Sequence, residues 1–409
     1  MRWIVLITLG CVATPQPDLD VLEAPASPSN GVDTTLSTTG ETTSTSASTE
    51  PRTCDLETRW PVPHWETGFP EDHGMDPEGL QAAADYARSM KSTCMAVVRN
   101  GVLVGEWTWR GNTPSDRVKS WSVAKSYAAT VVGRAHADGY LHDLDDPISD
   151  YLTDWQGTDR EGISIHHMLS MTSGLKFDLW EDNVEMFLAN DMTARALANP
   201  VRNPPGATWE YNNHTVQIAD PLLEAATGSP TALYAQEALF EPLGMSASWQ
   251  TDDVGHPAMY MNVLASCRDH AKMAYLYLRD GCWDGERLLE TDFVDRATSP
   301  SSTHNRGYGY WWWLNGESPL LDSVDFHVKP GWMHDYAPED AYCAAGLGSQ
   351  MVEVIPSLDL IVVRMGTAPI DDLSLWLQPR DLLDAMLSDG EQEAHNGVLA
   401  RVLSTIEEP

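Results

Sequence analysis

Two groups of strand-like segments lie far apart in the sequence, and together they constrain the fold more than any other feature. Residues 94–109 form two β-rich runs around Asn100-Gly101, a dipeptide that favours a tight hairpin turn. Near the other end, residues 349–356 and 358–366 form a second pair of runs around a proline turn. Most of the chain between them has helical spacing interrupted by Pro and Gly. This arrangement predicts an antiparallel β-sheet built from both ends of the domain, with helices inserted between them.

The expected fold class is therefore α+β, with an antiparallel sheet flanked by helices and an all-helical lobe at about residues 140–250. A helix of about four turns is expected from residue 122, because apolar residues recur on one face until Gly139. Residues 308–314, YGYWWWL, are expected to form another strand, with most of the Trp side chains packed in the core. The length of 409 residues and the 42% hydrophobic content suffice for a large core.

The first residues look like an export signal. Arg2 precedes a short apolar run that ends at Cys11 and is too short to cross a bilayer. The Gly10-Cys11 pair resembles the end of a bacterial lipoprotein signal, in which the cysteine is lipidated. We expect residues 1–10 to be the signal and residues 11–53 to be a flexible Ser/Thr-rich tether. The protein is then expected to be exported and held in the cell envelope by a lipid on Cys11, or otherwise to be secreted.

The folded domain is expected to span residues 54–389 and to be followed by a C-terminal tail at 390–409. The formal net charge of −35 argues against binding to nucleic acid and against electrostatic docking on anionic lipid, since both need clustered Lys and Arg. The sequence contains no CxxC or HExxH pattern, and the two possible ligands in CRDH at 267–270 have no second pair nearby, so no metal site is expected.

Export would permit disulfide bonds. Five cysteines follow Cys11, and this odd number leaves at least one free thiol or an intermolecular bond. We expect a bond between Cys267 and Cys282, because the sequence between them looks like one helix that folds back through a glycine turn. A second bond is expected between Cys54 and Cys94.

The chain contains two Ser-x-x-Lys patterns, Ser122-Val-Ala-Lys125 and Ser173-Gly-Leu-Lys176. The expected helix start places the Ser122 hydroxyl at the positive end of a helix dipole, with Lys125 one turn further on. The neighbours of Lys125 are apolar, and burial among them would lower the pKa of its amine. Ser173 lies in a turn and Lys176 is expected to be solvated, so the second pattern is interpreted as accidental.

Longer segments resemble the serine β-lactamase-like family, which contains class C β-lactamases, penicillin-binding proteins and related esterases and amide hydrolases. The resemblance covers about residues 75–385 and includes SWSVAKSYAATVVG, ISIHHMLSMTSGL and WEYNNHTVQIADPLLEAATG. It implies that Ser122 is a nucleophile and Lys125 its base. It also implies that Tyr211 shares the proton transfer and that Asn213 hydrogen-bonds Lys125 or the substrate. A second Tyr-x-Asn pattern, Tyr260-Met-Asn262, is expected at most to line the cleft.

A third motif departs from the penicillin-recognising members, which carry Lys-Thr-Gly or His-x-Gly on a strand beside the site. Here the equivalent residues are Ala344-Ala345-Gly346, so the cation that would pair with a substrate carboxylate is missing. The pattern is more similar to esterases and 6-aminohexanoate-dimer hydrolases. The resemblance implies that Gly346 lets the backbone approach the substrate and that the N–H groups of Leu347 and Ser122 form an oxyanion hole.

The sequence therefore predicts a serine hydrolase that cleaves a small ester or amide through an acyl-enzyme on Ser122, without a cofactor. Two alternatives remain open. One is an enzyme of the same fold that acts on D-amino-acid peptides or β-lactams. The other is a lipoprotein that uses the fold only for binding.

Overall fold

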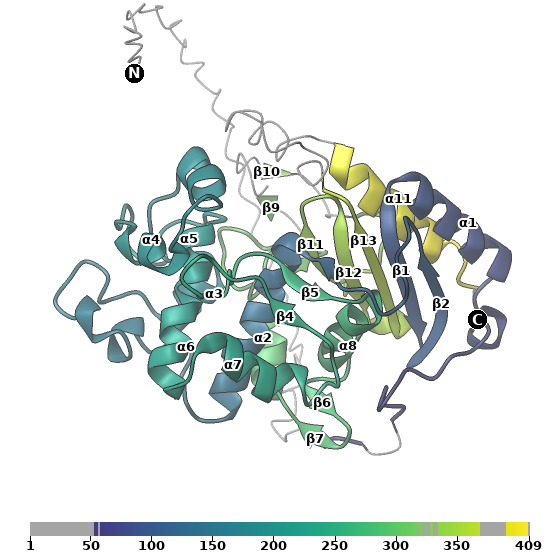
Figure 1. The fold of residues 1–409 in the computed structure, drawn as a ribbon, viewed down its shortest axis with the longest axis horizontal. Coiled ribbons are helices and arrows are strands. Elements are labelled where there is room, and N and C mark those ends of the chain that lie inside the picture. Colours follow the sequence, from purple (N-terminus) through teal and green to yellow (C-terminus); the bar gives the residue numbers. More distant parts are fainter. Residues whose placement is uncertain are drawn as a thin grey trace, which may run out of the picture. The chain divides into compact units, whose positions relative to one another are not determined.

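A six-stranded antiparallel sheet forms the centre of the computed structural model, which describes residues 53–55, 58–316, 320–321, 328–329, 334–368 and 390–407. The strand order is β2-β1-β13-β12-β11-β8, so strands from the start of the domain pair directly with strands from its end (Figure 1). The strands are β1 (Ser92–Arg99), β2 (Val102–Thr108), β8 (Trp313–Leu314), β11 (Tyr342–Gly346), β12 (Gln350–Ile355) and β13 (Leu360–Gly366). The prediction of an α+β fold with an antiparallel sheet is confirmed.

Both hairpins that the sequence predicts are formed, and each has the turn that its own residues favour. Asn100 and Gly101 have φ values of 52° and 75°, the left-handed conformation that a two-residue hairpin turn of this kind needs. The flanking residues Arg99 and Val102 pair with each other across the turn. At the other end, β12 and β13 are antiparallel neighbours joined by the 3-10 turn η7 (Pro356–Leu358).

Helices cover both faces of the sheet. On one face lie α1 (Pro77–Ser89) and α11 (Gly390–Leu403), which contact each other (Figure 1). On the other face, α8 (Cys267–Leu278) contacts β1, β12 and β13. Successive side chains of β1 point to opposite faces of the sheet. Val97 packs into the cluster under α1 and α11, and Val98 packs into the larger cluster on the other side.

The prediction that residues 390–409 form a tail outside the domain is wrong for the helix that begins there. Residues 390–403 form α11, and Val398, Leu399 and Val402 are buried in the layer that α11 shares with α1 and the sheet. The turn that follows α11 is also attached to the domain, because the Asp76 backbone N–H donates to the Thr405 carbonyl at 2.8 Å. The signal for this helix was weak because apolar residues recur in it over only a few turns.

A helical lobe is inserted between β2 and the later strands. It begins with the 3-10 turn η2 (Trp121–Val123), which leads into the almost completely buried helix α2 (Ala124–Ala137). Gly139 follows with φ 79°, the left-handed conformation that ends a helix. The other helical elements of the lobe are η3 (Ile148–Asp150), η4 (Thr153–Trp155), α3 (Ile165–Leu169), η5 (Glu181–Glu185), α4 (Met192–Ala198), α5 (Asn213–Gln217), α6 (Ala219–Thr227), α7 (Thr231–Ala235) and η6 (Gln236–Phe240).

Short elements connect the lobe to the sheet. A three-stranded sheet, in the order β3-β5-β4, lies next to the start of α2. The remaining short elements are η1 (Pro70–His73), β3 (Val118–Lys119), β4 (Ser248–Trp249), β5 (Val263–Ala265), β6 (Cys282–Trp283), β7 (Glu286–Arg287), α9 (Thr291–Ala297), β9 (Leu320–Leu321) and β10 (Val328–Lys329).

The strand expected at residues 308–314 is only partly formed. Trp311 has φ 58°, which turns the backbone, so that only Trp313 and Leu314 join the sheet as β8. Trp311 and Trp312 are fully buried, as the sequence predicts for most of the run. Trp313 is partly buried.

Both expected disulfide pairings are wrong, although the four cysteines involved are the right ones. Cys54 bonds to Cys282, and Cys94 bonds to Cys267. The helix between Cys267 and Cys282 is correctly predicted, but α8 packs across β1, and this brings its first residue beside β1 rather than beside its own C-terminal turn. Cys343 is the free thiol among the described cysteines, and it is buried.

The expected signal, tether and lipidated Cys11 lie outside the described residues. Within the described part of the chain, none of the helices combines the length and the apolar character needed to cross a membrane.

Candidate active site

Ser122 lies in the 3-10 turn that precedes α2, and its position is set by an unusual backbone conformation at the preceding residue. The preceding residue, Trp121, has φ 48°, a conformation that is uncommon for a residue with a bulky side chain. Asn262 holds this turn from the neighbouring segment: its Oδ1 accepts from Trp121 N at 3.1 Å, and its own N–H donates to Trp121 O at 3.0 Å. Ser122 itself is partly exposed, while the backbone before it is fixed by Asn262.

Lys125 is one helical turn beyond Ser122, and its amine is buried at the same point. Its Nζ lies 3.1 Å from Ser122 Oγ and donates to the Tyr260 carbonyl at 3.0 Å. Only 1% of Lys125 is exposed. This burial lowers the pKa of Lys125 to about 7, and the negative charge of Asp182 partly opposes the change. An amine with this pKa is neutral in a large fraction of molecules at neutral pH and can accept a proton.

Tyr211 completes a group of three side chains around Ser122 Oγ. The Lys125 Nζ lies 4.7 Å from the centroid of the Tyr211 ring. Burial raises the pKa of Tyr211, and a hydrogen bond with Ser122 partly opposes this effect. The Tyr211 ring also stacks on Trp313, with centroids 5.6 Å apart and an interplanar angle of 25°. The structure thus brings Ser122, Lys125 and Tyr211 together, while their roles in catalysis stay predictions.

Asn213 does not form the bond to Lys125 that the resemblance implies. Its side-chain Nδ2 instead donates to the Asp182 carbonyl at 3.2 Å, because Asn213 begins α5 directly against the turn that contains Asp182. Its Oδ1 is buried and has no hydrogen-bond partner among the described residues. A buried acceptor without a partner is costly, so the alternative role of Asn213, a hydrogen bond with substrate, remains a prediction.

Asp182 is the functional candidate that the sequence analysis missed. Its carboxylate is almost completely buried and accepts the backbone N–H of Asn213 at 2.8 Å and that of His214 at 3.2 Å. It also pairs with His214 Nδ1 at 2.8 Å. Asp182 therefore fixes the segment that carries Tyr211. No local pattern marks an isolated Asp in a helical lobe, so only the tertiary contact identifies it.

The end of β11 lies beside Ser122 at the position predicted for the oxyanion hole. A Cβ at position 346 would lie 2.6 Å from Ser120 O and 2.9 Å from Ser122 N, closer than side-chain carbons approach such atoms. Glycine is therefore required for β11 to reach the nucleophile. Leu347 begins the turn that follows, and its predicted role as the second N–H donor is untested.

A buried glutamine holds this turn in place. The Gln350 side chain donates to Leu347 O at 2.9 Å and to Gly366 O at 2.8 Å, and it accepts from Gly366 N at 2.8 Å. Arg364, also buried, donates to the carbonyls of Gly348 and Ser349. These bonds fix the backbone after Gly346.

We expect Gly346→Ala to reduce kcat about a hundredfold or more, because the new methyl group would push the strand away from Ser122 and displace an oxyanion donor. The measurement is steady-state hydrolysis of a chromogenic ester, together with the thermal unfolding midpoint. Gly162→Ala is the matched control, since a Cβ there meets no atom within 4 Å. Equal activity of the two variants would contradict the placement of the oxyanion hole.

The second Ser-x-x-Lys pattern forms no comparable group. The Ser173 hydroxyl is buried against Thr215 Oγ1 at 2.7 Å and accepts from Leu175 N at 3.2 Å. Lys176 pairs with Glu181 at 2.6 Å. This geometry agrees with the interpretation of the second pattern as accidental, although Lys176 is paired rather than simply solvated.

The second Tyr-x-Asn pattern contributes more than the sequence analysis expected. The carbonyl of Tyr260 is a hydrogen-bond partner of Lys125, and the side chain of Asn262 fixes the backbone before Ser122. The Tyr260 hydroxyl points elsewhere and donates to Met186 O at 3.2 Å. This segment supports the site through backbone geometry, which a sequence pattern does not reveal.

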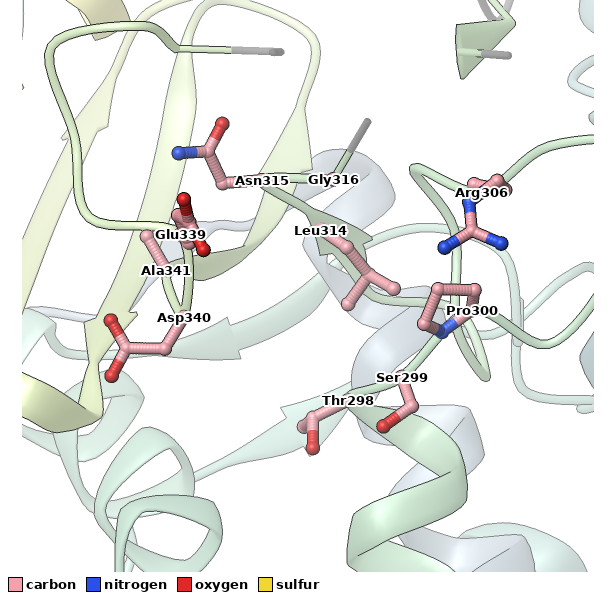
Figure 2. Close-up of a pocket in the computed structure, with 10 residues that line it drawn as sticks. All are labelled: Thr298, Ser299, Pro300, Arg306, Leu314, Asn315, Gly316, Glu339, Asp340 and Ala341. Atoms are coloured by element: carbon pink, nitrogen blue, oxygen red, sulfur yellow. The ribbon is translucent and has the colours of Figure 1, made fainter. Parts of the chain in front are cut away.

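A separate surface cavity of about 450 Å³ lies next to β8 (Figure 2). Arg306 lies across it from Glu339 and Asp340, and Leu314 and Asn315 form part of its wall. None of the residues around Ser122 lines this cavity, so it is distinct from the candidate active site.

Comparisons with known proteins agree with this geometry. The sequence model of the Beta-lactamase family matches residues 72–372. The 6-aminohexanoate-dimer hydrolase of Paenarthrobacter ureafaciens is 21% identical over 337 residues, which are 73% of this chain and 80% of that protein. Esterase EstB of Burkholderia gladioli is 30% identical over 142 residues, which are 30% of this chain and 36% of that protein.

A solved structure from Bacillus anthracis, named as a candidate 6-aminohexanoate-dimer hydrolase, superposes with a TM-score of 0.64. Its sequence identity is 15%, and the match covers 88% of this chain and 92% of that one. This likeness shows the fold alone. The family match covers well over half of the sequence, and the chain therefore belongs to the Beta-lactamase family of serine hydrolases.

Proposed function

We propose that this protein cleaves a small ester or amide through an acyl-enzyme on Ser122. The observation that carries the proposal is the buried Lys125 amine, 3.1 Å from the Ser122 hydroxyl and with its pKa lowered to about 7. A solvated lysine would remain protonated at neutral pH, but this amine can take the Ser122 proton.

In the proposed reaction, neutral Lys125, with Tyr211, accepts the proton of Ser122 as Oγ bonds to the substrate carbonyl carbon. The backbone N–H groups of Ser122 and Leu347 hold the resulting oxyanion. The proton then passes to the leaving alcohol or amine through Tyr211 or Lys125 as the carbonyl–leaving-group bond breaks. Water attacks the acyl-enzyme in the second half-reaction and restores Ser122.

The substrate class is inferred from the strand beside the site. Ala344 and Ala345 precede Gly346, so this part of β11 offers no cation for a substrate carboxylate. Uncharged acyl groups are therefore favoured over penicillins and peptidoglycan termini. The names of an esterase and an amide hydrolase among the relatives support the same class. The ring of Trp313, which stacks on Tyr211, would give an apolar wall for such a group.

We also propose the location expected from the N-terminal residues, namely export with a lipid anchor at Cys11 and a Ser/Thr-rich tether before the domain. The Ser/Thr-rich composition supports a tether, and the disulfide bonds agree with an oxidising compartment.

Labelling of the folded protein with a fluorophosphonate, followed by mass spectrometry of its peptides, tests the nucleophile directly. The adduct is expected on Ser122 and not on Ser173, because only Ser122 combines access with a neutral amine. The same preparation is then assayed with p-nitrophenyl acetate, p-nitrophenyl butyrate and nitrocefin. A folded protein without an adduct would favour a binding role, and preferential turnover of nitrocefin would favour the β-lactamase alternative.

A further inference from the structure

A thiol, a carboxylate and an imidazole meet between the sheet and α11. Cys343 in β11 and Glu353 in β12 are directly opposite each other in the strand register. His395 comes from α11, and its Nε2 lies 3.2 Å from Glu353 Oε2. The ligand atoms of the three residues all lie within 4.8 Å of one another, and all three residues are buried. This group lies outside the machinery described around Ser122.

The surroundings make this polar group unusual. Met351, Ile355, Val398 and Leu399 belong to the same buried layer, and all of them are apolar. Only 1% of Glu353 is exposed, and burial of a carboxylate in such a layer is costly unless charge or hydrogen bonds compensate it. Within the part of the chain that the structure describes, the imidazole of His395 and the thiol of Cys343 are modest compensation for a buried negative charge.

We propose that Cys343, Glu353 and His395 bind a zinc ion that fastens α11 to β11 and β12. Sulfur, imidazole nitrogen and carboxylate oxygen are the three donor types that zinc uses in proteins, whereas calcium and magnesium prefer sites made of oxygen alone. The presence of a sulfur donor that is in no disulfide therefore selects zinc from among the common divalent ions.

The charges balance when zinc binds. The Cys343 thiol releases its proton to solvent as the zinc–sulfur bond forms, and neutral His395 donates a lone pair from Nε2. The thiolate and the Glu353 carboxylate together neutralise the two positive charges of the ion. Water or a further imidazole would fill a fourth position, and the buried His334 has its ring centroid 5.3 Å from that of His395.

A second group of possible ligands fits zinc less well and provides a control. Asp220, Glu224 and His256 lie in the helical lobe and the loop beside it, and their ligand atoms also lie within 4.8 Å of one another. This group has no sulfur donor, and Glu224 and His256 are partly exposed. The Asp220 carboxylate is buried, but it already accepts from Thr193 Oγ1 at 2.6 Å and pairs with His256 Nδ1 at 2.9 Å, so the group needs a cation less than the first.

The sequence spacing of the three donors does not indicate the proposed zinc site, because they come from two strands and the last described helix. Cys343 is three residues before Gly346 on the same strand. Zinc would therefore anchor the strand that ends beside Ser122, without contacting the reacting atoms.

Zinc content tests the proposal. The full-length protein is loaded with zinc chloride, passed over a weak chelating resin and analysed by mass spectrometry of its metals. About one zinc ion per chain is expected in the wild type. Cys343→Ala and His395→Gln are expected to bind zinc at least about a hundredfold more weakly, whereas His256→Gln should retain it. Absence of zinc from the loaded wild type, or loss of zinc only in His256→Gln, would overturn the proposal.

Two further measurements separate ligand loss from misfolding. Cobalt(II) in place of zinc is expected to give a thiolate charge-transfer band in the wild type and in His256→Gln, and no such band in Cys343→Ala. Saturating zinc is expected to raise the thermal midpoint of the wild type by at least about 3 °C, with no shift in His395→Gln relative to the same variant without zinc. Equal shifts in the wild type and His395→Gln would overturn the proposal even if Cys343→Ala failed to fold.

Discussion

Ser122→Ala is expected to lower kcat/KM for a chromogenic ester at least about a thousandfold, because it removes the hydroxyl that lies 3.1 Å from the Lys125 amine, whose pKa is lowered to about 7. The residual rate would come from substrate binding and the oxyanion donors alone. The change removes one partly exposed oxygen atom, so the thermal midpoint should stay close to that of the wild type. The measurements are steady-state kinetics and thermal unfolding of the two proteins side by side.

Ser173→Ala is the matched control, since it makes the same change in the second Ser-x-x-Lys pattern. It removes the hydroxyl bonded to Thr215 and to Leu175 N, so some loss of stability is expected, of about 1–2 kcal/mol. Its kcat/KM should remain within a few-fold of the wild-type value. If Ser173→Ala lost activity while Ser122→Ala kept it, the assignment of the nucleophile would be wrong.

Lys125→Met is expected to lower kcat/KM about a thousandfold and to abolish its dependence on pH near neutrality. In the wild type, burial lowers the pKa of Lys125 to about 7. The amine is protonated below this pH and cannot accept the Ser122 proton, so activity should fall as the pH decreases through about 7 and level off above it. Methionine is uncharged and of similar length, so the variant can occupy the same buried position.

The matched control for this prediction is Lys176→Met. Lys176 pairs with Glu181 near the surface, and the loss of such a pair has little effect on stability or rate. Its pH profile should match that of the wild type. A titration near pH 7 that persisted in Lys125→Met would show that another group acts as the base.

The features that the sequence predicts correctly are those that depend on neighbouring residues. Asn100-Gly101 defines its hairpin because the turn needs two left-handed residues, whatever the rest of the chain does. The contact between Ser122 and Lys125 can likewise be predicted from the sequence, since one helical turn brings the two residues together. Tyr211 and Gly346 required the resemblance to a family, because no periodicity relates them to Ser122.

The features that the sequence analysis missed depend on how distant elements pack. The pairing of Cys94 with Cys267 follows from the position of α8 on β1, and the sequence favoured a partner closer along the chain. In the site, the contribution of Tyr260 is a carbonyl group, which every residue has. Asp182 acts by accepting backbone N–H groups of the segment after Tyr211, and only the folded lobe reveals that contact.

The strand order of the central sheet also determines when the protein can fold during its synthesis. Strand β1 is the first strand of the central sheet to be synthesised, yet one of its two partners, β13, is made more than 250 residues later. Until then β1 and β2 form only an isolated hairpin, which is marginal in water. The nascent chain therefore cannot complete its sheet until β13 has been made, and it remains without its native core until that point.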